Sequence, residues 1–159
     1  MALPTKAGQR SGRRAKPNPR AGILTPHPRL PEIWRAGMAR ILVVDDSVVV
    51  RRMLGLVLER AGHDVSFAVD GEEGLRATAS IAPDLLITDL EMPELDGIGL
   101  VRALRADPAL AAIPVVLLTA SGDEAHHRAA GEVQVEGFAT KPIRSTEVVD
   151  LVASLLRGR

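Results

Sequence analysis

Polar residues that end apolar runs of this sequence could together transfer a phosphoryl group. Asp45 and Asp46 follow "ILVV", Asp89 follows "LLIT", Thr119 ends "VVLLT" and Lys141 follows "FAT". Three carboxylates that lie close together cannot all ionise cheaply unless a cation shares the site. A hard divalent cation meets that need, and Mg²⁺ bound by one or two carboxylates, water and a phosphoryl group fits best. The residue types therefore predict a Mg²⁺-dependent phosphoryl-transfer site.

Each of these side chains would have its own part in the chemistry. Asp89 is the best candidate for the nucleophile, because a carboxylate can form an aspartyl phosphate while Asp45 and Asp46 hold the metal. Lys141 would supply a positive charge for an anion, and Thr119 would supply a hydroxyl donor. Capping of the following helix is the alternative for any single strand-terminal Asp or Thr, but it does not account for the lysine.

The elements that must position these side chains alternate along the chain from Met38 onward. Short apolar runs predict strands at residues 41–44, 64–69, 84–88, 113–120 and 137–140. Segments of helical period predict helices that begin after Ser47, Asp70, Asp96, about Gly122 and Pro142. Asp70 and Glu73 form a predicted capping box.

This alternation predicts an α/β fold. Strands with continuously apolar side chains are buried on both faces, so we expect a doubly wound, five-stranded parallel sheet with helices on either side. In such sheets ligands bind outside the carboxyl ends of the strands, where the strand order reverses. The polar residues at the strand ends are therefore expected to meet at one edge of the sheet.

The composition is that of a soluble globular protein. At 159 residues, with 46% hydrophobic and 25% charged residues, the chain has room for one ordinary domain. The absence of cysteine excludes disulfides, thiolate catalysis and zinc sites built on cysteine. No apolar run approaches the roughly 18 residues that cross a bilayer, and the N-terminus lacks the apolar core of a signal peptide. We therefore expect a cytoplasmic protein without a membrane partner.

The charge divides the chain into two parts. Residues 1–37 hold eight Lys or Arg residues and one acidic residue, whereas residues 38–159 hold twelve basic and nineteen acidic residues. Rich in proline and without a sustained period, residues 1–37 are predicted to form a flexible basic tail, and residues 38–159 the folded domain. The tail could contact nucleic acid, acidic lipid or the domain itself. The alternatives are a solvated tail without a role and residues upstream of a true start at Met38.

Four motifs, in family order, resemble those of the response regulator receiver domains. They are "VVDDS" (43–47), "LLITDLEMPELDG" (85–97), "VVLLTA" (115–120) and "FATKPI" (138–143), and the resemblance covers about residues 39–157. Single-domain chemotaxis regulators of this family have the flavodoxin-like strand order 2-1-3-4-5. The resemblance therefore implies that order for the expected sheet.

The resemblance also implies roles for the acidic residues. Asp89 would be the phosphoacceptor, and Asp46 and Asp89 would be Mg²⁺ ligands. Asp45 would bind the metal directly or through water. The backbone carbonyl of Glu91 would complete the protein ligands.

Further roles follow for residues around the phosphoryl group. Thr119 and Lys141 would contact the phosphate, with Ala120 as the small residue whose N–H can approach it. Phe138 matches the switch aromatic that swings inward when Thr119 moves onto the phosphoryl group, although core packing alone would also explain it. The Lys141–Pro142 bond is expected to be cis, as in the family.

One segment departs from the family pattern. Family members run from a helix-ending glycine to the switch aromatic in fewer residues than here, where "EVQVEG" separates Gly131 from Phe138. Either the preceding helix gains a turn or its loop is remodelled.

The implied function is that of a single-domain response regulator in a two-component phosphorelay. It would accept a phosphoryl group from a sensor histidine kinase or a histidine phosphotransfer protein and signal through contacts with a downstream protein, without acting as an enzyme on other substrates. A phosphorylation-linked homodimer is a further expectation, and nucleic acid would be contacted only through the basic tail. The alternatives are a phosphorylation-independent binding module and a Mg²⁺-dependent aspartyl-phosphate phosphatase.

Overall fold

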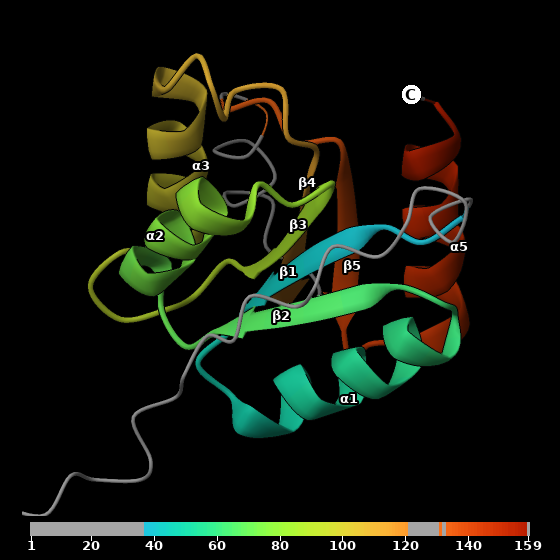
Figure 1. The fold of residues 1–159 in the computed structure, drawn as a ribbon. Helices are drawn as coiled ribbons and strands as arrows, with labels where there is room; N and C mark the ends of the chain where they lie inside the picture. The colour runs from blue at the N-terminus through green and yellow to red at the C-terminus, as the bar shows by residue number, and fades with distance from the viewer. Residues whose placement is uncertain (1–36, 121–130, 132, 159) are drawn as a thin grey trace, which may run out of the picture. The chain divides into compact units, whose positions relative to one another are not determined.

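The computed structural model describes residues 37–120, 131 and 133–158 (Figure 1). The strands within these residues are β1 (Arg40–Val44), β2 (Asp64–Ala68), β3 (Leu85–Asp89), β4 (Val115–Ala120) and β5 (Gly137–Lys141). The helices are α1 (Val48–Arg60), α2 (Gly71–Ile81), α3 (Gly97–Ala106) and α5 (Ser145–Arg157). The predicted tail, up to residue 36, lies outside the described residues, and so does most of the helix predicted to begin at about Gly122. Both stay predictions.

The sheet is parallel throughout and has the order β2-β1-β3-β4-β5. The strand order therefore reverses beside β1, which has β2 on one side and β3 on the other. Asp89 pairs with Leu118, and Ala120 pairs with Lys141, so the carboxyl ends of these strands lie in one row. The predicted fold class and strand order are confirmed, and the polar strand ends share one edge of the sheet.

Helices cover both faces of the sheet. Ile41 and Val43 join the core beneath α1 and α5, whereas Leu42 and Val44 join the core beneath α2 and α3. Figure 1 shows these two helix pairs on opposite sides of the strands. All four side chains are at most 1% exposed, which explains why β1 is a continuous apolar run in the sequence.

Side-chain oxygens cap the first turns of three helices. Asp70 accepts a hydrogen bond from the Glu73 amide at 2.7 Å, and the Glu73 carboxylate accepts one from the Val69 amide at 2.8 Å. This reciprocal pair is the predicted capping box, and it starts α2. Ser47 and Asp96 cap α1 and α3 through their side chains. The caps fix where each helix begins after the strand that precedes it.

Some strand bounds differ by one or two residues from the prediction. β4 begins at Val115 rather than at residue 113, because Pro114 has no N–H to donate and the Ile113 carbonyl is bound by Arg105. β3 ends one residue later than predicted and includes Asp89. The backbone of this residue is therefore fixed by strand pairing.

The segment that departs from the family pattern packs against the domain. Val133 is 6% exposed, and both it and Val135 contact the core beneath α2 and α3. Gln134 lies between them with a φ of +55°, and its carbonyl oxygen accepts hydrogen bonds from Arg105. Residues 133–136 are thus a docked loop rather than a helical turn, while most of the preceding helix lies outside the described residues.

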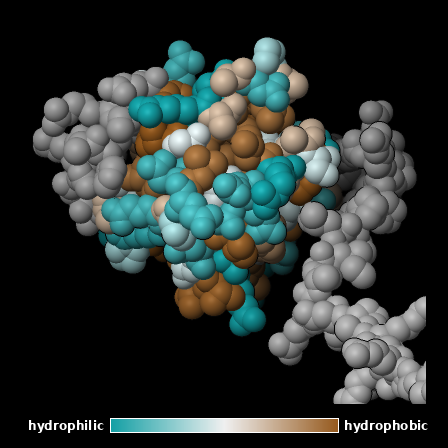
Figure 2. Space-filling view, turned by 90° about the vertical axis from the view of Figure 1, so that its left-hand side faces the viewer, coloured by the Kyte–Doolittle hydropathy of each residue, from teal (hydrophilic) through white to brown (hydrophobic). Residues whose placement is uncertain are grey.

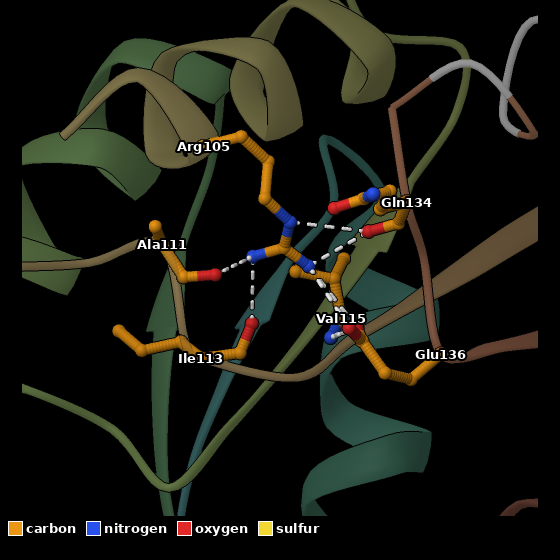
Figure 3. A network of polar contacts seen from close by, with 6 residues as sticks. All are labelled: Arg105, Ala111, Ile113, Val115, Gln134 and Glu136. Atoms are coloured by element: carbon orange, nitrogen blue, oxygen red, sulfur yellow. Dashed lines mark hydrogen bonds and ion pairs between the residues drawn. The ribbon is translucent and has the colours of Figure 1, made fainter. Parts of the chain in front are cut away.

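Arg105, in the last turn of α3, ties this loop to the one before β4 (Figure 3). Its Nη1 donates to the carbonyl oxygens of Ala111 and Ile113, both at 2.9 Å. Its Nε and Nη2 donate to the Gln134 carbonyl at 3.1 and 2.8 Å, and Nη2 also lies 3.1 Å from the Glu136 carboxylate. One guanidinium therefore holds both loops at the amino-terminal ends of β4 and β5.

The surface mixes polar and apolar residues. Figure 2 shows the side on which α2 and α3 lie, where hydrophilic and hydrophobic side chains are interspersed. Such a mixture is ordinary for the water-facing surface of a folded domain. Among the described residues, no helix is long and apolar enough to cross a bilayer.

Candidate functional site

Three carboxylates gather at the carboxyl edge of the sheet. Asp45 follows β1 directly, Asp46 comes next, and Asp89 is the last residue of the neighbouring β3. One oxygen from each lies within 4.8 Å of the others. Asp45 is fully buried and Asp89 is 5% exposed, whereas Asp46 is exposed. The acidic residues predicted from the sequence are therefore adjacent in space.

Lys141 is the cation that faces this cluster. Its Nζ lies 2.9 Å from Asp89 Oδ1 and 3.4 Å from Asp45 Oδ2. The Lys141 ammonium and the Arg51 guanidinium, which binds the Asp45 carbonyl, do not balance three ionised carboxylates, so the cluster has a surplus of negative charge. Clustered carboxylate oxygens with a surplus of charge are the donors that Mg²⁺ prefers. The residues present fit a bound Mg²⁺.

Asp45 is held by the turn between β1 and α1. Its amide donates to the Ala68 carbonyl at 3.2 Å, and its Oδ1 accepts from the Ser47 amide at 2.8 Å. Burial raises the pKa of Asp45 above its ordinary value of 3.8; the Ser47 amide opposes this rise, the charge of Asp89 adds to it, and Lys141 opposes it. On balance the pKa of Asp45 is raised, so a further cation would stabilise the ionised form of this side chain.

Lys141 is held in its charged form by the same neighbours. Burial by itself lowers the pKa of Lys141, but the hydrogen bonds and charges of Asp89 and Asp45 outweigh it and raise the pKa above 10.5. The ammonium is therefore protonated at neutral pH. The Lys141–Pro142 bond is cis, as expected.

Thr119 and Ala120 end β4 at the same edge. Because Leu118 pairs with Asp89, Thr119 lies one residue further toward the carboxyl edge. Thr119 is 3% exposed, and its Oγ1 donates to the Ala120 carbonyl at 3.0 Å. The predicted hydroxyl thus lies at the predicted edge, where it is bonded to the backbone.

Phe138 lies on β5, opposite Leu117 of β4. The residue is 37% exposed, so it lies partly at the surface rather than in the buried core. Core packing, the alternative left open by the sequence, therefore does not explain the residue. Its role as a switch stays a prediction.

The loop after β3 is held by two glycines. A Cβ at Gly97, the first residue of α3, would overlap the Asp89 carbonyl oxygen. A Cβ at Gly71, the first residue of α2, would overlap the Leu95 carbonyl oxygen. Both positions need glycine, because backbone atoms approach too closely for a side chain. The loop that carries Glu91 is thereby packed against the starts of two helices.

Sequence reasoning missed one residue that contacts the acidic pair. Arg51 donates from Nη1 to the Asp45 carbonyl at 2.6 Å. It stands four residues, about one helical turn, after the capping Ser47. Helical side chains lean toward the amino-terminus of their helix, so this spacing could have shown that Arg51 reaches back to the strand end.

This arrangement has a counterpart among known protein families. The sequence matches the response regulator receiver domain over residues 41–153. The chain belongs to the response regulator receiver family. It is therefore a receiver domain of two-component signalling, the class to which the four sequence motifs pointed.

Similar proteins include a transcriptional regulator and solved receiver structures. The DNA-binding dual master transcriptional regulator RpaA of Synechocystis sp. is 37% identical over 120 residues, which are 76% of this chain and 50% of that protein. The structure of chemotaxis protein CheY4 of Vibrio cholerae is 29% identical, with a TM-score of 0.71 over 74% of this chain and 98% of that one.

A further structure comes from a kinase. The signal receiver domain of a signal transduction histidine kinase from Syntrophus aciditrophicus is 36% identical, with a TM-score of 0.71 over 76% of this chain and 91% of that one. The chain spans about half the length of the curated relatives it matches.

Proposed function

We propose that this receiver domain takes a phosphoryl group onto Asp89 from the phosphohistidine of a sensor histidine kinase or a histidine phosphotransfer protein, in a Mg²⁺-dependent reaction. The observation that carries the proposal is one cluster of charged side chains, in which Asp45 and Asp89 are buried and Asp46 is exposed. In it Asp89 meets Lys141 at 2.9 Å and has oxygens of Asp45 and Asp46 within 4.8 Å. The residues proposed as the carboxylate nucleophile, the metal ligands and the cation for phosphoryl oxygens are these neighbouring side chains, which supports the proposal.

The metal would be held by residues of two strand ends and one loop. The proposed ligands are the carboxylates of Asp46 and Asp89, the carboxylate of Asp45 directly or through water, and the backbone carbonyl of Glu91. When bound, Mg²⁺ supplies positive charge that offsets the acidic cluster and the phosphoryl oxygens.

The transfer itself falls to Asp89 and its neighbours. One Asp89 oxygen forms a bond to phosphorus while the phosphorus–nitrogen bond of the donor breaks, and that electron pair leaves on the histidine nitrogen. Before the transfer the Lys141 ammonium is paired with the Asp89 carboxylate. It can turn to a phosphoryl oxygen, because it has three rotatable donors. Thr119 Oγ1 and the Ala120 amide are the proposed donors to the remaining oxygens.

The proposed output is a change of protein contacts. To reach the phosphoryl group, Thr119 must leave its bond to the Ala120 carbonyl. We propose that Phe138, which is partly exposed here, moves inward in response and alters the face presented to a downstream protein or a second copy of the domain.

The setting of this reaction is part of the proposal. The domain would act in the cytoplasm and would turn over only its own phosphoryl group rather than separate substrates. A single-domain regulator stays a prediction, because the chain spans about half the length of the DNA-binding relatives it matches. Any nucleic-acid contact is assigned to the basic residues 1–37.

Intact-mass spectrometry after incubation with acetyl phosphate tests the proposal. We expect the wild type to gain one phosphoryl group with Mg²⁺ and none without it, and Asp89→Asn to gain none in either condition. Asp96→Asn is the matched control, because asparagine caps a helix about as well as aspartate and this residue lies outside the acidic cluster. Labelling of Asp89→Asn to the wild-type level would contradict the assignment.

Beryllofluoride, which mimics a stable acyl phosphate, extends the same experiment. Binding that needs both Asp89 and Mg²⁺, in a wild type that shows no acetyl-phosphate adduct, would keep the site and imply rapid hydrolysis. Neither an adduct nor beryllofluoride binding on the folded wild type would contradict the proposal. That outcome would favour the phosphorylation-independent binding module.

A further inference from the structure

Arg51 makes a short contact with the backbone between the two adjacent acidic residues. It lies half-buried in the first turns of α1, and its amide donates to the Ser47 carbonyl at 3.1 Å. Its Nη1 donates to the Asp45 carbonyl oxygen at 2.6 Å. A guanidinium bond of this length is charge-assisted and stronger than a bond between neutral groups.

The acceptor belongs to the peptide that joins Asp45 to Asp46. Asp45 is already bonded through its amide to Ala68, through Oδ1 to Ser47 and through Oδ2 to Lys141. The peptide is planar, so a fixed Asp45 carbonyl also fixes the direction in which the chain enters the next residue. Arg51 thus sets where the Asp46 backbone begins.

Asp46 depends on this contact more than its neighbours do. Its side chain is exposed, whereas those of Asp45 and Asp89 are buried and contact Lys141. The position of the Asp46 carboxylate beside the other two therefore relies on its backbone. An exposed acidic side chain on a loosely held backbone would spread over many positions, at a cost in entropy when it binds a cation.

We propose that Arg51 is a positioning residue for Mg²⁺ binding. It holds the Asp45–Asp46 peptide so that the Asp46 carboxylate faces Asp89. The inference rests on the proposed Mg²⁺ site and adds a residue that acts on the metal through its ligands. Groups that orient metal ligands commonly control affinity in this way.

Charge and position predict opposite results for this residue. A guanidinium next to a dication site repels the dication, so its removal should strengthen Mg²⁺ binding if charge alone matters. Removal of a positioning contact should weaken Mg²⁺ binding instead. The sign of the change therefore separates the two effects.

Isothermal titration of Mg²⁺ into the full chain measures the sign of this change in affinity. Arg51→Met and Arg52→Met are each compared with the wild type. Methionine keeps much of the aliphatic stem and removes the donors and the charge. Arg52 is the matched control, because it is the neighbouring arginine on the same helix and is exposed. We expect Arg51→Met to weaken Mg²⁺ binding roughly 10-fold, the lower end for groups that orient ligands. Arg52→Met should bind Mg²⁺ as the wild type does or slightly more tightly.

Circular dichroism in EDTA and the rise in melting temperature on adding Mg²⁺ complete the test. Arg51→Met should have the wild-type spectrum in EDTA and a smaller rise with Mg²⁺. Equal or tighter Mg²⁺ binding by this variant would overturn the inference and leave the proposed function intact. Failure to fold in EDTA would also overturn it, since Arg51 would then be required for the domain itself. No Mg²⁺ binding by the wild type would overturn the proposed function and this inference together.

Discussion

Replacement of Arg105 by methionine should remove a large share of the domain's stability. Methionine keeps much of the aliphatic stem but removes the guanidinium that binds the loops before β4 and β5 (Figure 3). The Arg105 side chain is only 16% exposed, so water has little access to it. The substitution leaves the carbonyls of Ala111, Ile113 and Gln134 without this donor.

The size of the loss follows from the exposure of each acceptor. Ile113 is buried, and a buried carbonyl left without a donor costs about 1–3 kcal/mol. Ala111 is half-buried and Gln134 is exposed, so water can replace the guanidinium there and each contributes about 0.5 kcal/mol. The ion pair with Glu136, whose side chain is 40% exposed, adds no more than about 0.5 kcal/mol after solvent screening. We expect a loss of about 3 kcal/mol, from the 5–15 kcal/mol typical of a folded domain.

Urea unfolding in EDTA, followed by circular dichroism, measures this loss. At a slope of about 2 kcal/mol per molar urea, the midpoint of Arg105→Met should fall by about 1.5 M. Arg76→Met is the matched control, because Arg76 pairs with Glu72 where the two side chains are 70% and 62% exposed. The control midpoint should move by less than about 0.3 M. A similarly small change for Arg105→Met would refute the conclusion that one guanidinium holds both loops.

Two further substitutions test how the site is built, again by urea midpoints in EDTA. The pKa of Asp45 is raised in the folded domain, so ionisation of this side chain costs stability. The contribution of Asp45 to the free energy of unfolding is complete below its pKa in the unfolded chain, near 3.8, and is lost as the pH rises through the raised pKa. Asp45→Asn should therefore gain stability over the wild type as the pH rises from about 4 to about 8, and a difference that does not vary with pH would contradict this. Gly97→Ala should unfold at lower urea than Gly99→Ala. The Cβ added at position 97 would overlap a backbone atom, the Asp89 carbonyl oxygen, whereas the Cβ added at position 99 would meet the movable end of the Leu95 side chain. Both substitutions replace glycine by alanine in the first turn of α3, so equal midpoints would argue against the backbone overlap.

The fold could be predicted because its signals are local. β1 is a continuous apolar run because both of its faces are buried, and the capping box of Asp70 and Glu73 needs residues only three positions apart. Parallel strands bring their carboxyl ends to one edge, so Asp45 and Asp89 could be placed together before their distance was known.

Contacts between distant parts of the chain could not be predicted in the same way. Lys141 reaches Asp45 across 96 residues, and Arg105 reaches the Gln134 carbonyl across 29 residues. Each contact depends on the relative register of two strands or the rotation of a helix, and a shift of one residue in a strand turns a side chain to the opposite face. The residue types predicted only that Lys141 would meet an anion, and nothing in the sequence near Arg105 indicated its acceptors.

The sequence by itself determined the alternation of strands and helices, the receiver-family motifs and the identities of the residues at the strand ends, because motif spacing and hydrophobic period are properties of neighbouring residues. The strand order was implied only by the resemblance to the family. The tertiary structure decided that Lys141 meets Asp89 at 2.9 Å, that Arg51 binds the Asp45 carbonyl, and that Phe138 is partly exposed rather than in the core. These features depend on how strands and helices pack in three dimensions, where a distance of one or two ångströms separates a bond from none.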